Sequence, residues 1–147
     1  MQPLAIPVPL FRYFGNGHHF YTTDLPEAVA TIAGRTLEGI ECYIFNHQVE
    51  GTLPFYRYYG NNDHFYTTNF DELGEGKNGY VLEGIQGYVY SSHQENTVPL
   101  YRYYGKGDHF YTTNFDELGD GKSGYRAEGI AGYVFKIPPP PQPLPPN

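Results

Sequence analysis

PLYRYYGKGDHFYTT at residues 99–113 recurs with few changes as PFYRYYGNNDHFYTT at residues 54–68 and as PLFRYFGNGHHFYTT at residues 9–23. The three stretches align without gaps at an offset of 45 residues, and the match extends beyond them. Residues 54–90 and 99–135 are identical at 28 of 37 positions. A fixed period of this length is typical of tandem supersecondary units that bury their apolar faces against one another.

A second motif closes each repeat. It reads LEGIECYIF, LEGIQGYVY and AEGIAGYVF at residues 37–45, 82–90 and 127–135. We therefore expect a single domain over residues 1–137, built of three 45-residue repeats at 9–53, 54–98 and 99–137. The remaining residues, 138–147, read PPPPQPLPPN. Proline lacks the N–H that a sheet needs, so this segment is predicted to be an extended tail that does not join a sheet and tethers the domain to another one.

The composition narrows the class of protein. A chain of 147 residues with 16 Tyr, 10 Phe, 18 Gly and 13 Pro indicates short strands joined by tight turns. Its formal charge of −7 argues against a nucleic-acid partner. No apolar run is long enough to predict a membrane span, and no secretion signal is recognisable at the start. The single cysteine, Cys42, stands where the other repeats have Gly87 and Gly132, so a buried, inert thiol is expected.

Repeat three shows the local structure most clearly. Two aromatic runs flank the turn GKGD, which predicts a hairpin. Asn114 is placed to cap one short helical turn. The last motif supplies one or two further strands, with Gly129 and Gly132 marking a bulge or tight turn. Each repeat is thus predicted to hold three or four strands and one helical turn.

One such unit cannot bury its aromatic face alone. We therefore expect an all-β fold in which the three repeats form a closed array with three-fold pseudosymmetry, because closure also removes exposed strand edges. The 45-residue period favours a three-bladed β-propeller-like ring. A β-trefoil is the alternative, since three is the number of units in a trefoil.

The paired motifs R-Y-Y/F-G-x-x-D/H-H-F-Y-T-T and E-G-I-x-G/C-Y-V/I-F/Y resemble a tyrosine-rich repeat module of unknown function. That module occurs in bacterial and fungal secreted or surface proteins, and the resemblance covers residues 9–136. It implies an accessory or binding domain that is secreted or held at the cell surface, and it transfers no catalytic residue. Repeat one departs from the others after Thr23, so a site built by the following loop is expected twice rather than three times.

Polar residues recur where strands should pack. Arginines lie in the first strand of each repeat, and glutamates open the second motif. One interpretation is an ion pair within each repeat, with the guanidinium stacked on a tyrosine. The other is a fork that hydrogen-bonds vicinal sugar hydroxyls while a tyrosine covers the ring. The candidate ligand-binding residues of these types are Arg12, Arg57, Arg102, Glu38, Glu83, Glu128, Tyr13, Tyr58 and Tyr103.

Histidines recur at the start of the second strand, at His19, His64 and His109, and complete the candidate ligand-binding set. Around a three-fold axis they could form a three-histidine zinc site. The more ordinary role is a hydrogen bond to the preceding acid, Asp63 or Asp108. We therefore expect no metal and no other cofactor.

These features favour a non-catalytic, multivalent carbohydrate-binding module of lectin type, with a glycan or cell-wall polysaccharide as its partner. The alternative is a protein-binding or structural accessory domain of a secreted protein. A metal-dependent enzyme using the three histidines is the third hypothesis, and the sequence favours a protein that is not an enzyme. Several equivalent weak sites raise avidity by roughly 10²–10⁴-fold, which gives the repetition a physical purpose.

Overall fold

The computed structural model of the chain describes residues 3–24, 31–32 and 34–146. Strands account for 59% of the described residues, and helix is limited there to two single 3-10 turns. The all-β expectation is therefore confirmed. Within the same residues, no helix has the length and apolar character needed to cross a membrane.

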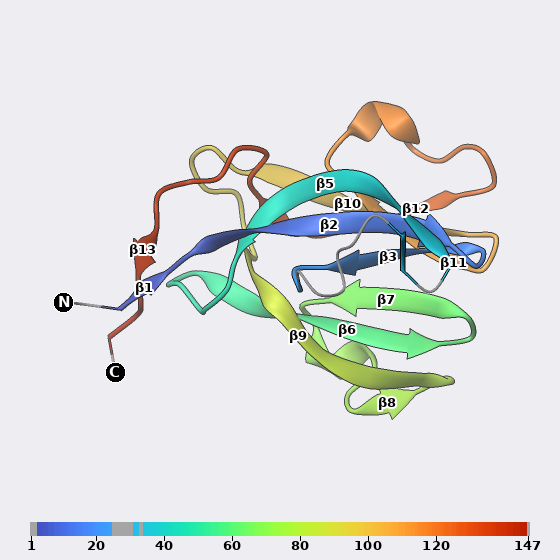
Figure 1. The fold of residues 1–147 in the computed structure, drawn as a ribbon, viewed down its shortest axis with the longest axis horizontal. Coiled ribbons are helices and arrows are strands. Elements are labelled where there is room, and N and C mark those ends of the chain that lie inside the picture. Colours follow the sequence, from blue (N-terminus) through green and yellow to red (C-terminus); the bar gives the residue numbers. More distant parts are fainter. Residues whose placement is uncertain (1–2, 25–30, 33, 147) are drawn as a thin grey trace.

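Each repeat forms a three-stranded antiparallel unit (Figure 1). Repeat one contains β2 (Pro7–Gly15), β3 (His18–Thr22) and β5 (Arg35–Phe45). Repeat two contains β6 (Thr52–Gly60), β7 (Asp63–Thr67) and β9 (Tyr80–Tyr90). Repeat three contains β10 (Val98–Gly105), β11 (Asp108–Thr112) and β12 (Arg126–Val134). The first strand of each unit lies between the other two, and the hairpin predicted from the GKGD turn is the pair β10–β11. The short strands β4 (Thr31–Ile32) and β8 (Gly76–Lys77) pair antiparallel with β5 and β9, respectively.

The three units join where their long strands β5, β9 and β12 cross near their ends. Each junction is one residue pair: Phe45 with Tyr88, Tyr90 with Tyr133, and Tyr43 with Phe135. The longest path of paired strands runs from β11 to β3 and does not close on itself. Strand pairing thus shows the all-β class, and it does not establish the closed propeller or trefoil that the repeats predict.

Two bulges interrupt each long strand. In repeat one, two residues of β5 have no pairing partner in β2. They are Glu38 and Glu41. The same two positions are skipped in the other repeats: Glu83, Gln86, Glu128 and Ala131. The bulge predicted around the glycines is therefore present. A bulged residue leaves the regular alternation, and here it directs a glutamate toward the arginine of the first strand.

The core lies between the inner strands β3, β7 and β11, all five residues of which are buried in each case. Its centre is formed by Tyr21, Tyr66 and Tyr111, packed with Cys42 and other apolar side chains. The tyrosine rings meet edge to face at centroid distances of 5.3–5.4 Å. Cys42 is 1% exposed and burial raises the pKa of its thiol, in agreement with the expected inert cysteine.

Hydroxyl groups, rather than strand pairing, satisfy the inner edges of the three hairpins. The Tyr66 hydroxyl donates to the carbonyl of Tyr21 at 2.6 Å and accepts from its N–H at 2.7 Å. The Tyr21 hydroxyl bonds the backbone carbonyl and N–H of Tyr111 in the same way, and the Tyr111 hydroxyl bonds those of Tyr66. The cycle passes once through each repeat. We call these three residues the tyrosine cycle.

The proline-rich segment does join a sheet, contrary to the sequence-based expectation. Strand β13 (Gln142–Pro143) pairs with β1 (Leu4–Ala5), so the two ends of the chain lie side by side (Figure 1). A ladder of two residues needs few donors, and Gln142 interrupts the prolines. Leu144 then packs on a cluster that includes the fully buried Ala5, which anchors the tail to the domain.

Candidate functional site

A pocket of about 190 Å³ opens at the joint between repeats three and one. We call it the 3–1 pocket; its lining residues are Arg12, His19, Glu38, Phe110, Glu117, Leu118 and Tyr125. Repeats two and three place the equivalent residues at their own joint, the 2–3 joint. These are Arg102, His109, Glu128, Phe65, Glu72, Leu73 and Tyr80.

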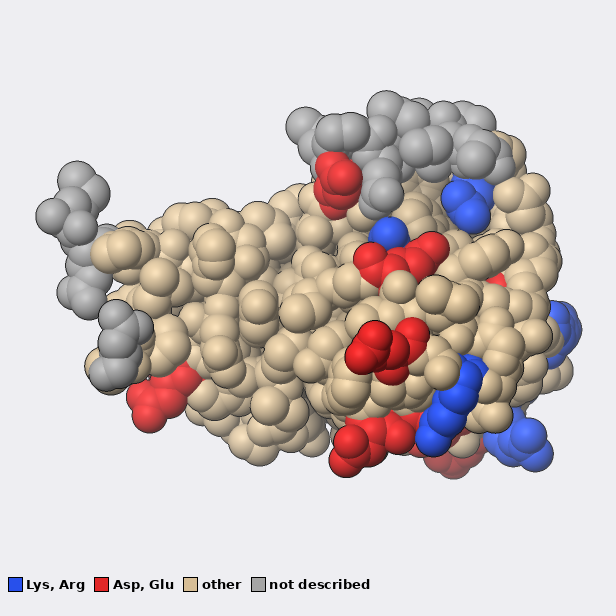
Figure 2. Space-filling model, turned by 90° about the horizontal axis from the view of Figure 1, so that it is seen from below, with Lys and Arg blue, Asp and Glu red and all other residues tan. Residues whose placement is uncertain are grey.

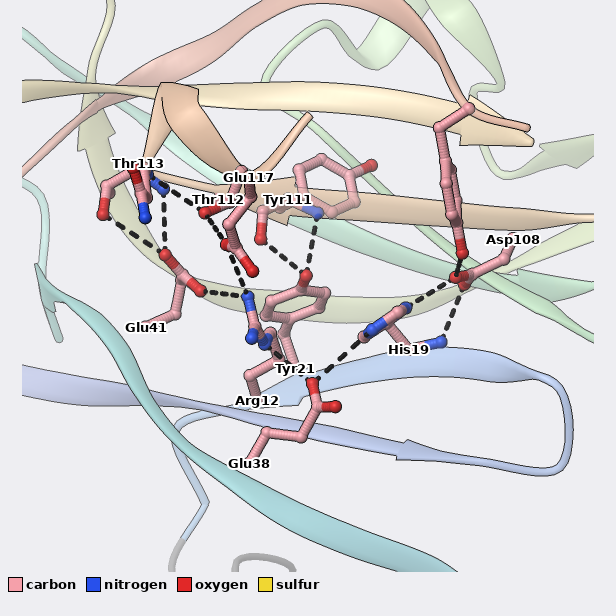
Figure 3. A network of polar contacts seen from close by, with 12 residues as sticks. Arg12, His19, Tyr21, Glu38, Glu41, Asp108, Tyr111, Thr112, Thr113 and Glu117 are labelled. Atoms are coloured by element: carbon pink, nitrogen blue, oxygen red, sulfur yellow. Dashed lines mark hydrogen bonds and ion pairs between the residues drawn. The ribbon is translucent and has the colours of Figure 1, made fainter. Parts of the chain in front are cut away.

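Arg12 lies among three carboxylates at one side of the 3–1 pocket (Figure 3). Its Nε donates to Glu38 at 2.8 Å, and its Nη1 donates to Glu41 at 2.9 Å and to Glu117 at 3.3 Å. Burial acts to lower the pKa of Arg12, but Tyr21 and the carboxylates outweigh it and raise that pKa. The bulged positions of Glu38 and Glu41 bring both acids to the same guanidinium.

The ion pair predicted within each repeat is therefore present. Arg57 Nε donates to Glu83 at 2.8 Å, and Arg102 Nε donates to Glu128 at 2.9 Å. The predicted stacking partner is wrong, because each guanidinium lies over a phenylalanine of the preceding repeat and not over a tyrosine. The pairs are Arg12 on Phe110, Arg57 on Phe20 and Arg102 on Phe65, at 4.8–5.0 Å from the ring centroid. The arginines thus join neighbouring repeats.

His19 connects the same two repeats through an acid of repeat three (Figure 3). The backbone N–H of His19 donates to Asp108 Oδ1 at 2.7 Å. Its imidazole Nδ1 lies 2.5 Å from Asp108 Oδ2, and its imidazole Nε2 lies 3.5 Å from Glu38. Burial lowers the pKa of His19, but the hydrogen bonds to Asp108 and Glu38 outweigh it and raise that pKa. Tyr125 also donates to Asp108 at 2.7 Å.

His109 makes the matching contacts in the 2–3 joint. The backbone N–H of His109 donates to Asp63 at 2.8 Å, and its imidazole Nδ1 lies 2.5 Å from the same carboxylate. The Tyr80 hydroxyl also donates to that carboxylate. The expectation that each histidine bonds the acid preceding it is therefore wrong, since the acid comes from the neighbouring repeat. The tyrosine cycle, not the histidines, occupies the centre between the repeats. Among the described residues no three His, Cys, Asp or Glu side chains form a group that could hold a metal ion.

The joint between repeats one and two departs from this pattern. His18 occupies the position of Asp63 and Asp108, and its Nε2 lies 2.9 Å from Nδ1 of His64. Burial lowers the pKa of both imidazoles. Arg35 stands where the other repeats have a tyrosine and stacks on Phe20 at 4.7 Å. This joint therefore holds two imidazoles in contact where the others hold an imidazole and a carboxylate.

The two loop glutamates of the joints are placed by short capped turns. The 3-10 turns η2 (Phe70–Glu72) and η3 (Phe115–Glu117) each follow an asparagine cap, which confirms the cap predicted at Asn114. Thr112 donates to Glu117 at 2.5 Å, and Thr67 donates likewise to Glu72. Neither glutamate was recognised from the sequence, although both end the capped turn of a loop that occurs twice.

Tyr13, Tyr58 and Tyr103 do not line the 3–1 pocket. All three side chains are at most 1% exposed. The hydroxyls of Tyr58 and Tyr103 donate to the carbonyls of Gly74 and Gly119 at 2.6 Å, which fixes the loops after the 3-10 turns. The prediction that these three tyrosines contact a ligand is therefore corrected, because the first strand of each repeat directs their side chains into the interior. The nine arginines, histidines and glutamates of the predicted set all lie in the joints.

Comparison with known proteins gives one match. The family model described as "Domain of unknown function (DUF5648)" matches residues 9–135. No curated protein and no solved structure matches the chain.

Proposed function

Since the chain belongs to the DUF5648 family, a domain of unknown function, we propose its function from the joints themselves: it is a non-catalytic carbohydrate-binding module. The observation that carries this proposal is the 3–1 pocket, in which a guanidinium, an imidazole and two half-exposed carboxylates surround a small cavity edged by aromatic rings. Such groups hydrogen-bond the hydroxyls of one sugar ring from several sides. The ligand would be a glycan or a cell-wall polysaccharide outside the cell.

The size of the cavity supports a small ligand unit. Its volume of about 190 Å³ lies below the ~300–1,000 Å³ of pockets for drug-sized molecules. One ring of a polysaccharide suits this volume, with the rest of the polymer in solvent. The carboxylates are already paired with Arg12 and His19, so their orientation is set before a ligand arrives.

The repetition supports two binding sites. The 2–3 joint contains every residue type of the 3–1 pocket, whereas the joint of repeats one and two has His18 and Arg35 in place of the acid and the tyrosine. We further propose that the repeats are related by an approximate three-fold axis, because the tyrosine cycle and the inter-repeat Arg–Phe contacts each pass around all three. Two weak sites on one rigid body would gain avidity on a polymer.

A glycan array followed by NMR titration with any glycan that binds tests the proposal. We expect the imidazole signals of His19 and His109 to shift, because both lie in the proposed sites. His47 and His93 serve as internal controls, since both are exposed and lie outside the joints. Absence of binding to every glycan, or shifts confined to the control histidines, would contradict the proposal.

A second candidate function, protein binding, is favoured by a different surface. Phe70 is 41% exposed and its ring packs at a tilt against that of Tyr56, with the ring centroids 5.3 Å apart, beside the exposed Ile85. Phe115, Tyr101 and Ile130 repeat the arrangement in repeat three. Exposed apolar groups of this kind are common in protein interfaces. A glycan-independent interaction that is lost in the F70S/F115S double variant would favour this function over the first.

A further inference from the structure

We infer that the 3–1 pocket selects sugars that carry a free amino group, with the ammonium held between Glu38 and Glu117. The inference rests on the proposed carbohydrate-binding function and names the class of its ligand. The two glutamates lie on opposite sides of Arg12 (Figure 3), and both line the pocket. Their side chains are 34% and 35% exposed, so a ligand in the cavity reaches both.

Each of these glutamates has an oxygen left for a ligand. In Glu38, Oε1 serves both Arg12 and His19. In Glu117, Oε1 serves both Thr112 and Arg12. Among the described residues, Oε2 of neither glutamate takes part in a hydrogen bond or ion pair. Two carboxylate oxygens that flank one cavity accept the N–H groups of an ammonium more strongly than those of a neutral donor.

The charge balance of the pocket is negative. Two cations, Arg12 and His19, face four carboxylates within their hydrogen-bonding shell. These carboxylates belong to Glu38, Glu41, Glu117 and Asp108. The sum is −2 with the imidazole protonated and −3 with it neutral. A cationic ligand reduces this excess, and an anionic sugar would increase it.

Glu41 is the residue that distinguishes this pocket from its counterpart. Its side chain is 7% exposed, and it binds Arg12 on one oxygen and the amide and hydroxyl of Thr113 on the other. The aligned residues are Gln86 and Ala131. The 2–3 joint therefore lacks this charge, and we expect it to discriminate less between an amino sugar and its neutral parent.

The net charge of the chain has the same sign. On the face drawn in Figure 2, acidic and basic side chains are interspersed on the half of the molecule away from the chain ends. The chain as a whole carries a formal charge of −7. The negative net charge of the protein would attract a polymer of basic sugar units, whereas it would repel sulfated or uronic-acid polymers.

NMR titration with glucosamine, glucose, N-acetylglucosamine and Nα-acetyl-lysine amide tests the inference. We expect glucosamine to bind about tenfold more tightly than glucose, because ionic hydrogen bonds replace neutral ones. N-acetylglucosamine, in which the amine is no longer charged, should bind like glucose. The variant E117Q should remove most of the preference for glucosamine. The variant E95Q changes the same charge on the exposed segment 91–96 and should leave the preference intact.

The outcomes separate this inference from the proposed function. Equal affinities for glucosamine and glucose at the 3–1 pocket would overturn the inference and leave the sugar site in place. Tighter binding of the lysine derivative than of glucosamine would assign the pocket to a basic peptide and overturn the inference as well. Failure of every sugar to bind there would remove the proposed function and the inference together.

Discussion

Replacing Tyr111 with phenylalanine is expected to lower the free energy of unfolding by about 2–6 kcal/mol, although the substitution removes a single oxygen atom. That oxygen donates to the carbonyl of Tyr66 and accepts from its N–H. Tyr66 of β7 lies opposite Arg57 of β6 in a non-hydrogen-bonded pair. The N–H and carbonyl of Tyr66 therefore point away from β6, and the Tyr111 hydroxyl is their partner. Two buried backbone groups therefore lose their partner, at about 1–3 kcal/mol each. Chemical denaturation measures the loss.

The variant Y59F is the matched control. Tyr59 is 38% exposed, and the loss of its hydroxyl should change stability by less than about 0.5 kcal/mol. Both substitutions keep the aromatic ring, so neither opens a cavity. A loss for Y111F as small as that of the control would show that the tyrosine cycle does not hold the hairpin edges together.

The sequence predicted well those features that lie within one repeat. The pair Arg12–Glu38 joins two strands of the same unit, and it was recognisable because both residues recur at the same offset. The cap at Asn114 and the bulge near Gly129 follow from local backbone preferences. Each of these features depends on residues that are close in the chain or paired inside one three-stranded unit.

The features that join the repeats could not be predicted in this way. His109 could have met either Asp63 or Asp108, and both choices fit a repeating sequence equally well. Only the relative placement of two repeats decides between them. The same applies to the stacking of Arg12 on Phe110, a residue of repeat three. Periodicity shows that environments are equivalent, and it does not show which repeat supplies the neighbour.

The tyrosines illustrate a further limit. Tyr13 and Tyr21 both recur in every repeat, and nothing in their spacing separates a loop anchor from the centre of the core. Alternation along a strand usually makes this distinction, because one face of a strand is exposed. Strand β3 lacks an exposed face, since all five of its residues are buried. The pattern that would have assigned Tyr21 to the core is therefore missing.

The buried histidine pair makes the stability of the fold depend on pH in a direction opposite to that of the other joints. Burial lowers the pKa of His18 and His64 in the folded chain. The unfolded chain then binds protons more readily, so the stability contributed above about pH 6.5 is lost as the pH falls through the lowered pKa values. The pKa of His19 and His109 is raised, so their contribution is present at acidic pH and is lost as the pH rises.

The variant H18D should remove the acid-sensitive component. It gives the joint between repeats one and two the carboxylate that the others have in Asp63 and Asp108. The new acid would meet His64, whose pKa should rise, and it would lie near Arg35. An ionic hydrogen bond then replaces the contact between two imidazoles. We expect H18D to exceed the wild-type protein by about 2 kcal/mol at pH 5, and by less at pH 8. Urea unfolding at the two pH values measures the difference.

The reverse exchange, D63H, provides the matched comparison. It creates a second imidazole pair, with His109, and it also removes the acceptor of the His109 N–H and of the Tyr80 hydroxyl. Its stability should therefore fall at both pH values and fall most at pH 5. Glu83 and Arg57 flank His64 in all these variants and stay unchanged. If H18D were no more stable than the wild-type protein at pH 5, the acid sensitivity would have to arise elsewhere than in the His18–His64 contact, because that variant removes the only imidazole pair among the described inter-repeat joints.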